Sequence, residues 1–303
     1  QYAPLVSLGR SSTSTSISAN FGQRPFAISS IPTGFKSLCT TNLTDPTIAD
    51  GSTAFGALTY SGNGSARTLT GLNMNPDFIW IKSRSSAQKH VLVDSVRTTS
   101  TGEYLASDST QAEGTGVHIS GTTNGITIAD PNASTIWYND SSHTYVAWAW
   151  DAGTSTVSNT DGSITSSVRA NASAGFSIVK YTSGSGSQND TVGHGLNAVP
   201  ELILLKRIDG SDPFVVSHKN VSVGDYLELN STSGTQTSAS VFETAHTSSV
   251  FGIGTDGRVN AGGNSYIAYC FAPVEGYSKF GSYTVNGWAD ALFVDIGWSE
   301  AVV

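Results

Sequence analysis

Charged side chains are scarce in this sequence of 303 residues. Asp, Glu, Lys and Arg make up only 13% of it, against about 25% in an average globular protein. Ser, Thr, Gly and Asn take their place, as is typical of β-rich proteins in which turns and hydroxyl-lined strands replace salt-bridged helices. Hydrophobic residues still make up 38% of the chain and aromatic residues 10%, so the composition supports packed cores and does not indicate disorder.

Clusters of positive charge are missing as well. The formal net charge is −8 and the sequence pI is about 5.1, and the Lys and Arg residues are scattered along the chain. Nucleic-acid binding relies on grouped cations that release counterions, so we expect no nucleic-acid partner. No stretch approaches the roughly 18 apolar residues of a membrane span. No signal peptide is visible, and we expect no membrane insertion.

Cysteine occurs only twice, at Cys39 and Cys270. The two residues lie far apart in different segments, and two cysteines do not make a disulfide scaffold. We favour two buried free thiols, because a free cysteine behaves as a small hydrophobic residue. A disulfide or a shared metal ion is the alternative.

Helical periodicity is nearly absent. No window repeats apolar residues at i, i+3, i+4 and i+7 over three turns. Strand-like runs are common instead, and several alternate with a period of two. In Tyr145–Trp150, the tyrosine and two alanines fall on one face, and the valine and two tryptophans on the other. Clusters of Gly, Asn and Ser separate these runs at the spacing of a β-sandwich.

An internal repeat organises the chain. Asn75–Lys82 and Val199–Lys206 each place a Pro before an acid and a hydrophobic run that ends in Lys, at an offset of 124 residues. Two further motifs recur in the same order: GEYL returns as GDYL at an offset of 122, and TYVAWAW as SYIAYCF at an offset of 121. Chance similarity between strands would not preserve both order and spacing, so the sequence predicts tandem copies.

The opening of each copy carries an anchor tyrosine, at Tyr60, Tyr181 and Tyr283. The steps between them are 121 and 102 residues, and the difference matches the polar connector Thr154–Ala172. This connector contains Asp161-Gly162, a signal for a hairpin turn. We therefore expect an extra β-ribbon or an ordered arm between the first two copies.

These observations predict an all-β fold class, with tandem antiparallel β-sandwich repeats of the jelly-roll type. The third copy stops where the first has Phe78–Trp80. We expect its strands to continue in a longer parent chain or to pair with another subunit by strand addition. The predicted segments are the end of a preceding domain with a linker (1–45), the first copy (50–153), the connector (154–172), the second copy (173–276) and the truncated third copy (277–303).

Two stretches resemble known families. Residues 20–43, NFGQRPFAISSIPTGFKSLCTTNL, resemble the C-terminal end of the SPRY-like, concanavalin-type domains of phage tail-fibre proteins. From about residue 50 onward the chain resembles a repeated β-domain of unassigned function in cyanophage and other marine-phage virion proteins. The matching motifs are TYSGNG, NPDFIWIKSR, TYVAWAW, VRANASAGFSIVKY and VGHGLNAVPELILLK.

The second resemblance implies a structural protein of a phage virion, such as a tail fibre, spike or head-decorating appendage, located on the virion and outside the cell. The partners it implies are other virion subunits, in a homo-oligomer for which a trimer is favoured, together with a host cell-surface glycan. A secreted glycan-binding adhesin or lectin module is the alternative. A glycan depolymerase is less favoured, because it predicts clustered acids and a parallel β-helix with shorter periods.

Aromatic residues are the best candidates for ligand contacts. Trp137, followed by Tyr138 and Asn139 in a polar loop, is the candidate site for stacking a sugar ring. The remaining tryptophans of the first copy exchange with other large apolar residues in the second, as core residues do. The pairs are Trp80 with Leu204, Trp148 with Tyr269, and Trp150 with Phe271.

We expect no catalytic residues, no cofactor and no metal. Asp77 and Glu201 occupy equivalent repeat positions, which indicates strand-initiating turns rather than paired catalytic carboxylates. His194 lies between glycines without a second His at zinc spacing. The oxygen-rich turn Asn159–Ser163 lacks the later bidentate Glu of a calcium loop. No G-x-S-x-G elbow is present, so the chain is predicted not to be an enzyme.

Overall fold

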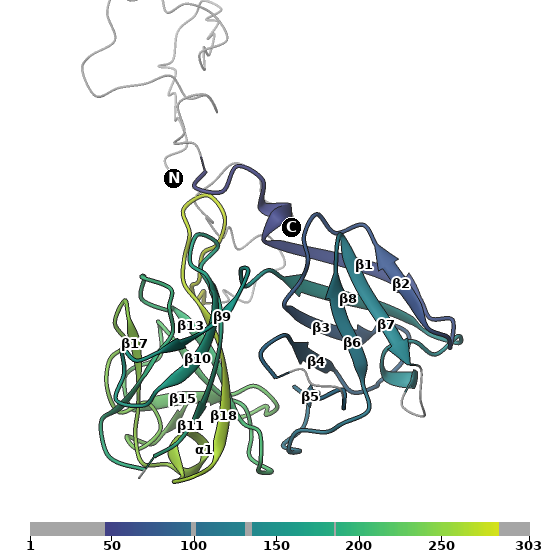
Figure 1. Cartoon of the computed structure of the whole chain (residues 1–303). Coiled ribbons are helices and arrows are strands. Elements are labelled where there is room, and N and C mark those ends of the chain that lie inside the picture. The colour runs from purple at the N-terminus through teal and green to yellow at the C-terminus, as the bar shows by residue number, and fades with distance from the viewer. Residues whose placement is uncertain (1–45, 98–100, 131–134, 185, 285–303) are drawn as a thin grey trace, which may run out of the picture. The chain divides into compact units, whose positions relative to one another are not determined.

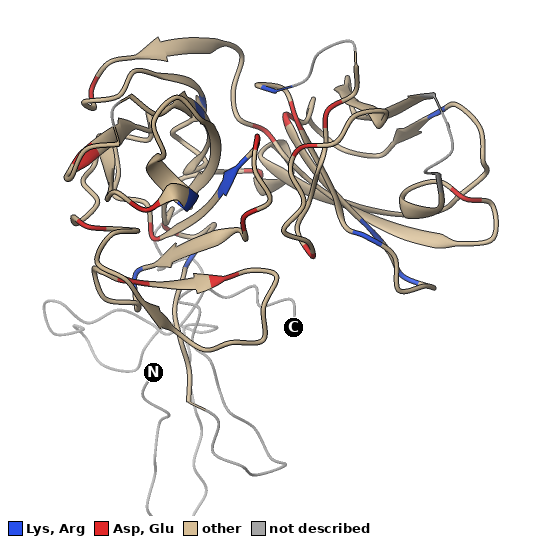
Figure 2. Cartoon of the chain, turned by 90° about the horizontal axis from the view of Figure 1, so that it is seen from below, with Lys and Arg blue, Asp and Glu red and all other residues tan. Residues whose placement is uncertain are grey.

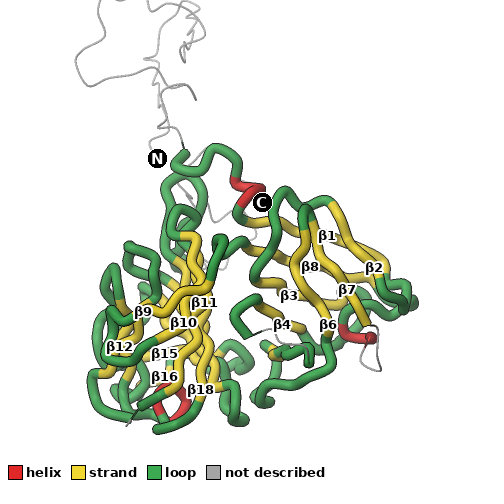
Figure 3. The backbone as a smooth tube through the Cα atoms, in the orientation of Figure 1, coloured by secondary structure: helices red, strands yellow, loops and turns green. Residues whose placement is uncertain are grey.

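The computed structural model describes residues 46–97, 101–130, 135–184 and 186–284. Its regular structure is almost entirely antiparallel strand (Figure 3). In these residues helix is limited to the short segments η2 (Gly51–Thr53), η3 (Thr135–Trp137) and α1 (Gly257–Asn260). None of the described helices is long and apolar enough to span a membrane. The predicted all-β sandwich class is confirmed.

The first copy consists of two antiparallel sheets (Figure 1). The larger has the strand order β1-β8-β3-β4-β5 and the smaller the order β2-β7-β6. The strands are β1 (Phe55–Ser61), β2 (Arg67–Thr70), β3 (Phe78–Ser83), β4 (Val91–Asp94), β5 (Leu105–Ala106), β6 (His118–Thr122), β7 (Gly125–Asp130) and β8 (Thr144–Trp150).

The second copy repeats the strand order of the larger sheet, and its smaller sheet has two strands in place of three. Its larger sheet contains the order β11-β18-β13-β14-β15, and its smaller sheet pairs β12 with β17. The strands are β11 (Phe176–Thr182), β12 (Asp190–Gly193), β13 (Leu202–Arg207), β14 (Val215–His218), β15 (Asp225–Glu228), β16 (Gln236–Thr237), β17 (Val250–Ile253) and β18 (Ser265–Phe271). The registers match too, because Tyr60 pairs with Tyr145 and Tyr181 with Tyr266.

The connector adds two strands to the second copy. β9 (Thr156–Asn159) and β10 (Ser166–Asn171) form a hairpin, and β10 pairs with β11. The loop between them is longer than a two-residue turn, and Gly162 lets it approach the backbone oxygen of Thr191, which a Cβ would meet at 2.4 Å. The connector therefore belongs to the larger sheet, and β9 is its edge strand.

Two stacked tyrosines hold each sandwich together in the same way. In the first copy the Tyr60 and Tyr145 rings stack with centroids 5.3 Å apart. The Tyr60 hydroxyl donates to the carbonyl oxygen of Tyr138, and that of Tyr145 to Ile136. The equivalent rings of the second copy, Tyr181 and Tyr266, stack at 5.0 Å.

The phenols of the second copy make equivalent bonds. They donate to the carbonyl oxygens of Val259 and Gly257. All four phenols thus fasten the short helical segment of their copy to the larger sheet, and this accounts for the repeated anchor tyrosines.

The lysine that ends the repeated strand motif has a structural role in both copies. The Lys82 ammonium donates to the carbonyl oxygens of Ser83 and Ser86. Lys206 makes the equivalent bonds to Arg207 and Gly210. Burial lowers the pKa of Lys206 to about 8. Each lysine closes the loop that follows its strand.

Residues Thr47–Ser282 form one compact unit. The amide of Thr47, its first residue, donates to the carbonyl oxygen of Glu275 near its last. Residues 280–284 contain no strand. Residues 1–45, predicted to be the end of a SPRY-like domain with a linker, Cys39 and the rest of the predicted third copy lie outside the described residues. Cys270 is a buried free thiol, and burial raises its pKa.

Replacing Tyr266 by Phe is expected to lower the free energy of unfolding by about 1–3 kcal/mol, because the buried groups that it contacts lose their partner. Hydrogen exchange should show reduced protection in β11 and β18, the strands that carry the stacked tyrosines. Tyr283→Phe, at a position that is 66% exposed, is the matched control and should change stability by less than about 0.5 kcal/mol. Unchanged protection in these strands would contradict an anchoring role for Tyr266.

Candidate functional site

The outer faces of the two larger sheets pack against each other and share one hydrophobic core. Phe78 and Tyr269 stack with ring centroids 4.2 Å apart. Trp150 and Phe271, which occupy equivalent positions in the two copies, meet edge to face at 6.2 Å. Equivalent surfaces of the two copies therefore face each other, as in a two-fold dimer. The buried members of this core are Phe78, Leu92, Leu105, Ala152, Phe176, Ile178, Leu204, Ile208, Phe214, Val216, Ile267 and Tyr269.

A buried polar cluster lies within this contact. Asp94 accepts from the Arg97 guanidinium at 2.6 Å and from the Tyr269 hydroxyl of the other copy at 2.8 Å. Arg97 also contacts the Tyr269 oxygen at 3.1 Å and Glu113 at 2.8 Å. Burial alone would lower the pKa of Arg97, but the adjacent Asp94 carboxylate outweighs it and the pKa is raised. The guanidinium therefore stays charged and joins the two copies.

The same contact contains an apolar cavity of about 370 Å³. Aromatic rings from both copies, including Phe55, Trp150 and Phe176, form much of its lining. Trp80, one of the tryptophans that exchanges between the copies, lines it together with its counterpart Leu204. The exchanging positions thus lie on the faces that meet.

The residues predicted as a sugar-stacking site lie at the edge of the first copy's core. Trp137 is half-buried, with the Lys89 ammonium 5.0 Å from its ring centroid and the Tyr104 ring 5.7 Å away. Tyr138 and Asn139 are fully buried. Of the three side chains, only Trp137 presents surface to a ligand, and glycan stacking on it stays a prediction.

Asn139 is a repeated loop anchor. Its amide donates to Asn63 and to the carbonyl oxygen of Ser65. Asn260 occupies the equivalent position in the second copy and donates to the carbonyl oxygens of Ser187 and Gly254. The repeat contains this signal, because Asn139 and Asn260 are separated by the same 121 residues as the paired tyrosines.

Each copy has a cavity at the same place, where the repeated Pro-acid pair begins its strand. We call them the first cavity, of about 350 Å³, and the second cavity, of about 280 Å³. The first is lined by Asn75, Pro76, Asp77, Ile79, Val93, Asp94, Ser95, Ile119, Ser120, Gly121 and Arg169. The second is lined by Val199, Pro200, Glu201, Ser217, His218, Lys219, Val221, Ser222, Val223, Phe242, Thr244, Ala245 and His246.

An ion pair of the same polarity lies in both cavities. In the first, Asp77 is 2.6 Å from the Arg169 guanidinium of the connector and accepts from the amide of Ala152. Burial raises the pKa of Asp77, although the Ala152 amide and Arg169 oppose it. In the second, Glu201 pairs with Lys219 at 2.9 Å. Sequence reasoning identified both acids as structural but did not find the cavities, whose walls come from distant segments.

The second cavity also contains a serine–histidine contact. Nε2 of His246 lies 2.8 Å from the Ser217 hydroxyl, and Nδ1 accepts from the amide of Gly252 at 3.4 Å. Burial lowers the pKa of His246 to about 4, and the nearby His194 adds to this effect. The imidazole is therefore neutral near pH 7, and the tautomer that satisfies both contacts has its proton on Nε2.

Other candidate groups have partners within the fold. His194 is buried; its Nδ1 accepts from the amide of Leu196, and its Nε2 lies 3.1 Å from the Thr247 carbonyl oxygen. Asn159 and Asp161 bond each other in the oxygen-rich turn. Among the described residues, no three His, Cys, Asp or Glu side chains are grouped to hold a metal ion.

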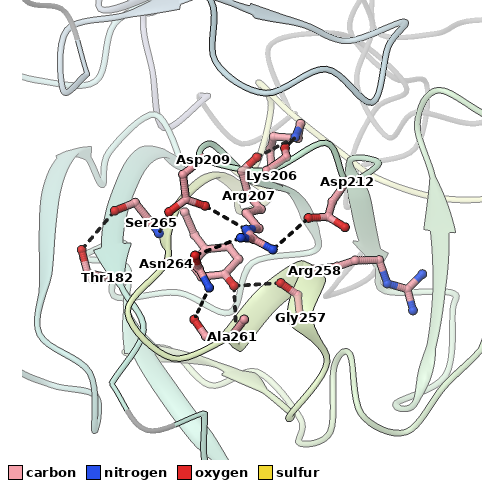
Figure 4. A network of polar contacts seen from close by, with 12 residues as sticks. Thr182, Lys206, Arg207, Asp209, Asp212, Gly257, Arg258, Ala261, Asn264 and Ser265 are labelled. Carbon is pink, nitrogen blue, oxygen red and sulfur yellow. Dashed lines mark hydrogen bonds and ion pairs between the residues drawn. The ribbon is translucent and has the colours of Figure 1, made fainter.

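A network of polar contacts closes the end of β13 (Figure 4). Arg207 binds Asp209, Asp212 and Asn264. The described Lys and Arg residues elsewhere lie singly over both copies rather than in one stripe (Figure 2).

The sequence model of a family described as a domain of unknown function, DUF7483, matches residues 50–303. The chain belongs to this family. The matched region covers both copies together with the connector. Neither the curated proteins nor the solved structures contain a match to this chain.

Replacing Asp94 by Asn is expected to destabilise the protein by about 3 kcal/mol, because the buried Arg97 would keep only the partly exposed Glu113 as a counter-charge. The double variant Asp94→Asn/Arg97→Met should lose less, since it also removes the orphaned charge. Urea unfolding measures both. The control Asp212→Asn removes a longer, partly exposed contact to Arg207 and should cost less than about 1 kcal/mol. Equal losses in the single and double variants would contradict a buried ion pair at this contact.

The lowered pKa of His246 predicts sensitivity to acid. The unfolded chain takes up the proton near pH 6.5 and the folded chain only near pH 4, so this residue reduces stability as pH falls between those values, by up to about 3 kcal/mol. His246→Gln should flatten this part of the pH profile in urea unfolding. An NMR titration should place the midpoint of the His246 ring signal near pH 4, and a midpoint near 6.5 would contradict the burial argument.

Proposed function

We propose that this chain is a structural part of a phage virion, such as a tail fibre, spike or head-decorating appendage. The observation that carries the proposal is the shared core between the two copies, centred on contacts such as Phe78 with Tyr269. This core holds the two copies together as one rigid body, whereas copies joined only by a flexible linker would move independently. Rigid display of β-sandwich modules is what an appendage requires, and the motif resemblance from residue 50 onward supports this location.

The connector supports the same role. A flexible linker would be rich in glycine and unpaired, whereas β9 and β10 extend the larger sheet of the second copy. Arg169 on β10 pairs with Asp77 of the first copy. The connector is therefore held to the second copy by strand pairing and to the first copy by an ion pair.

A homo-oligomer, with a trimer favoured, forms part of the proposal. The outermost strand β9 has no charged residue, and Val157 on it is 54% exposed. Natural edge strands are usually protected by charge or proline. This edge is suited to strand addition by another subunit, and the host-surface glycan remains the proposed external partner.

A secreted glycan-binding adhesin is the second candidate, and the second cavity is the observation that favours it. A depolymerase is less favoured, because the described sheets are antiparallel and not a parallel β-helix. A serine nucleophile is also less favoured. Because Gly252 donates to Nδ1 of His246, Nε2 has no free lone pair with which to accept the Ser217 proton.

Gold-labelled antibodies against the chain should bind at fixed positions on purified virions of the phage that encodes it, as seen by electron microscopy. Light scattering of the purified chain should give three times the monomer mass. Val157→Lys, which places a charge on the exposed edge, should lower that mass, whereas Val223→Lys away from β9 should not. Virions without label would overturn the structural role, and an unchanged mass for Val157→Lys would overturn edge pairing.

A further inference from the structure

The second cavity differs from the first in its polar side chains. Four polar side chains of the second cavity, Ser217, His218, Lys219 and His246, have the counterparts Val93, Asp94, Ser95 and Gly121 in the first. The first copy builds the equivalent larger sheet without that set, and its smaller sheet has a third strand, β6, at Gly121. The second cavity therefore has its own set of hydrogen-bonding groups, and ligand binding is one explanation for Ser217 and Lys219.

The serine–histidine contact leaves a donor available in the second cavity. With the proton on Nε2, His246 donates to the Ser217 oxygen across 2.8 Å. The serine's own hydroxyl hydrogen is then free to donate to a bound molecule. Because the histidine stays neutral, this arrangement provides hydrogen bonding without charge.

The charges that face the second cavity balance. Glu201 and Lys219 form an ion pair at 2.9 Å, with side chains that are 22% and 35% exposed. The pair offers both an acceptor and a donor at the rim. Glu201 would repel a phosphate or carboxylate ligand, and Lys219 would repel a cation. The site therefore favours a neutral ligand with hydroxyl groups.

Apolar surface completes the lining. Val199 and Val223 are 48% and 59% exposed, unusually open for large aliphatic residues. Val221 and the buried Phe242 extend the apolar wall inward. A ligand that matches this cavity has one apolar face and several neutral hydroxyls, and it is small, because about 280 Å³ lies at the lower end of ligand pockets.

We propose that the second cavity binds a single neutral pyranose ring, with C–H groups against the valines and hydroxyls toward Ser217 and the Glu201–Lys219 pair. The proposal does not depend on a virion location, since it rests on the lining of this one cavity. It places sugar recognition in the second copy, away from Trp137.

Titration of the isotope-labelled full chain with methyl glycosides of neutral hexoses and N-acetylhexosamines tests this inference by NMR. Saturable shifts are expected in the amides of Ser217, Lys219 and His246 at up to tens of millimolar sugar. Sialic acid and inorganic phosphate are the anionic probes and should bind more weakly. Absence of saturable shifts with every neutral glycoside, or preferential binding of an anion, would overturn the proposal.

Two variants replace a residue of the second cavity by its counterpart in the first cavity. They distinguish a loss of sugar binding from a loss of folding. Lys219→Ser and Ser217→Val should each weaken binding by roughly tenfold, because each removes a hydrogen-bonding group. Lys219→Ser removes only a partly exposed ion pair, so its thermal unfolding should be nearly unchanged. Ser120→Ala in the first cavity and Trp137→Phe are the matched controls and should bind as the parent does.

Two results distinguish this inference from its rivals. Unchanged binding in folded Lys219→Ser, or a loss in Trp137→Phe, would place the sugar elsewhere and overturn the assignment. Unlabelled virions combined with intact binding to the second cavity would reject the virion role and retain the sugar site.

Discussion

Both faces of each larger sheet are apolar, and this constraint governs the rest of the structure. In β3, Ile79 and Ile81 belong to the core of the first copy, whereas Phe78 and Trp80 point to the other side. A strand that is hydrophobic on both faces must be covered twice. The smaller sheet of each copy covers one face, and the larger sheet of the other copy covers the second face. Exposing that face would leave its aromatic and aliphatic side chains in contact with water, which soluble monomers avoid over large contiguous areas.

The buried ion pair restricts how the two copies can align. Hydrophobic surfaces alone would tolerate small slips, but Asp94 and Arg97 must meet the Tyr269 hydroxyl in a single arrangement. The positions equivalent to Asp94 and Arg97 in the second copy hold His218 and Val221. The polar cluster therefore occurs on only one side of an otherwise two-fold contact. We interpret it as a device that selects one alignment, a role documented for some buried polar groups.

The repeat motifs predicted more of the fold than the individual strands did. The equivalence of TYVAWAW with SYIAYCF anticipates the matched pairing of β8 with β1 and of β18 with β11. The exchange of Trp80 with Leu204 was interpreted as core packing, and both side chains lie in or against the shared core. Periodicity reveals that a face is apolar, but it does not reveal which distant surface covers it.

The candidate site was less accessible to prediction. The aromatic composition of the loop drew attention to Trp137, Tyr138 and Asn139, although the 121-residue spacing of Asn139 and Asn260 already indicated a repeated structural position. The second cavity combines residues from β14, from the strand-initiating turn at Glu201 and from the segment around His246. Those segments are brought together only by tertiary packing, so no local motif marks them.

The bond between Thr47 and Glu275 brings the first residues of the compact unit next to its last. If the chain continued on both sides, a force pulling on its two flanks would act first on this contact. While the contact held, the stacked sheets would lie beside the line of the force and bear none of it. The unit would then project sideways from a stretched chain.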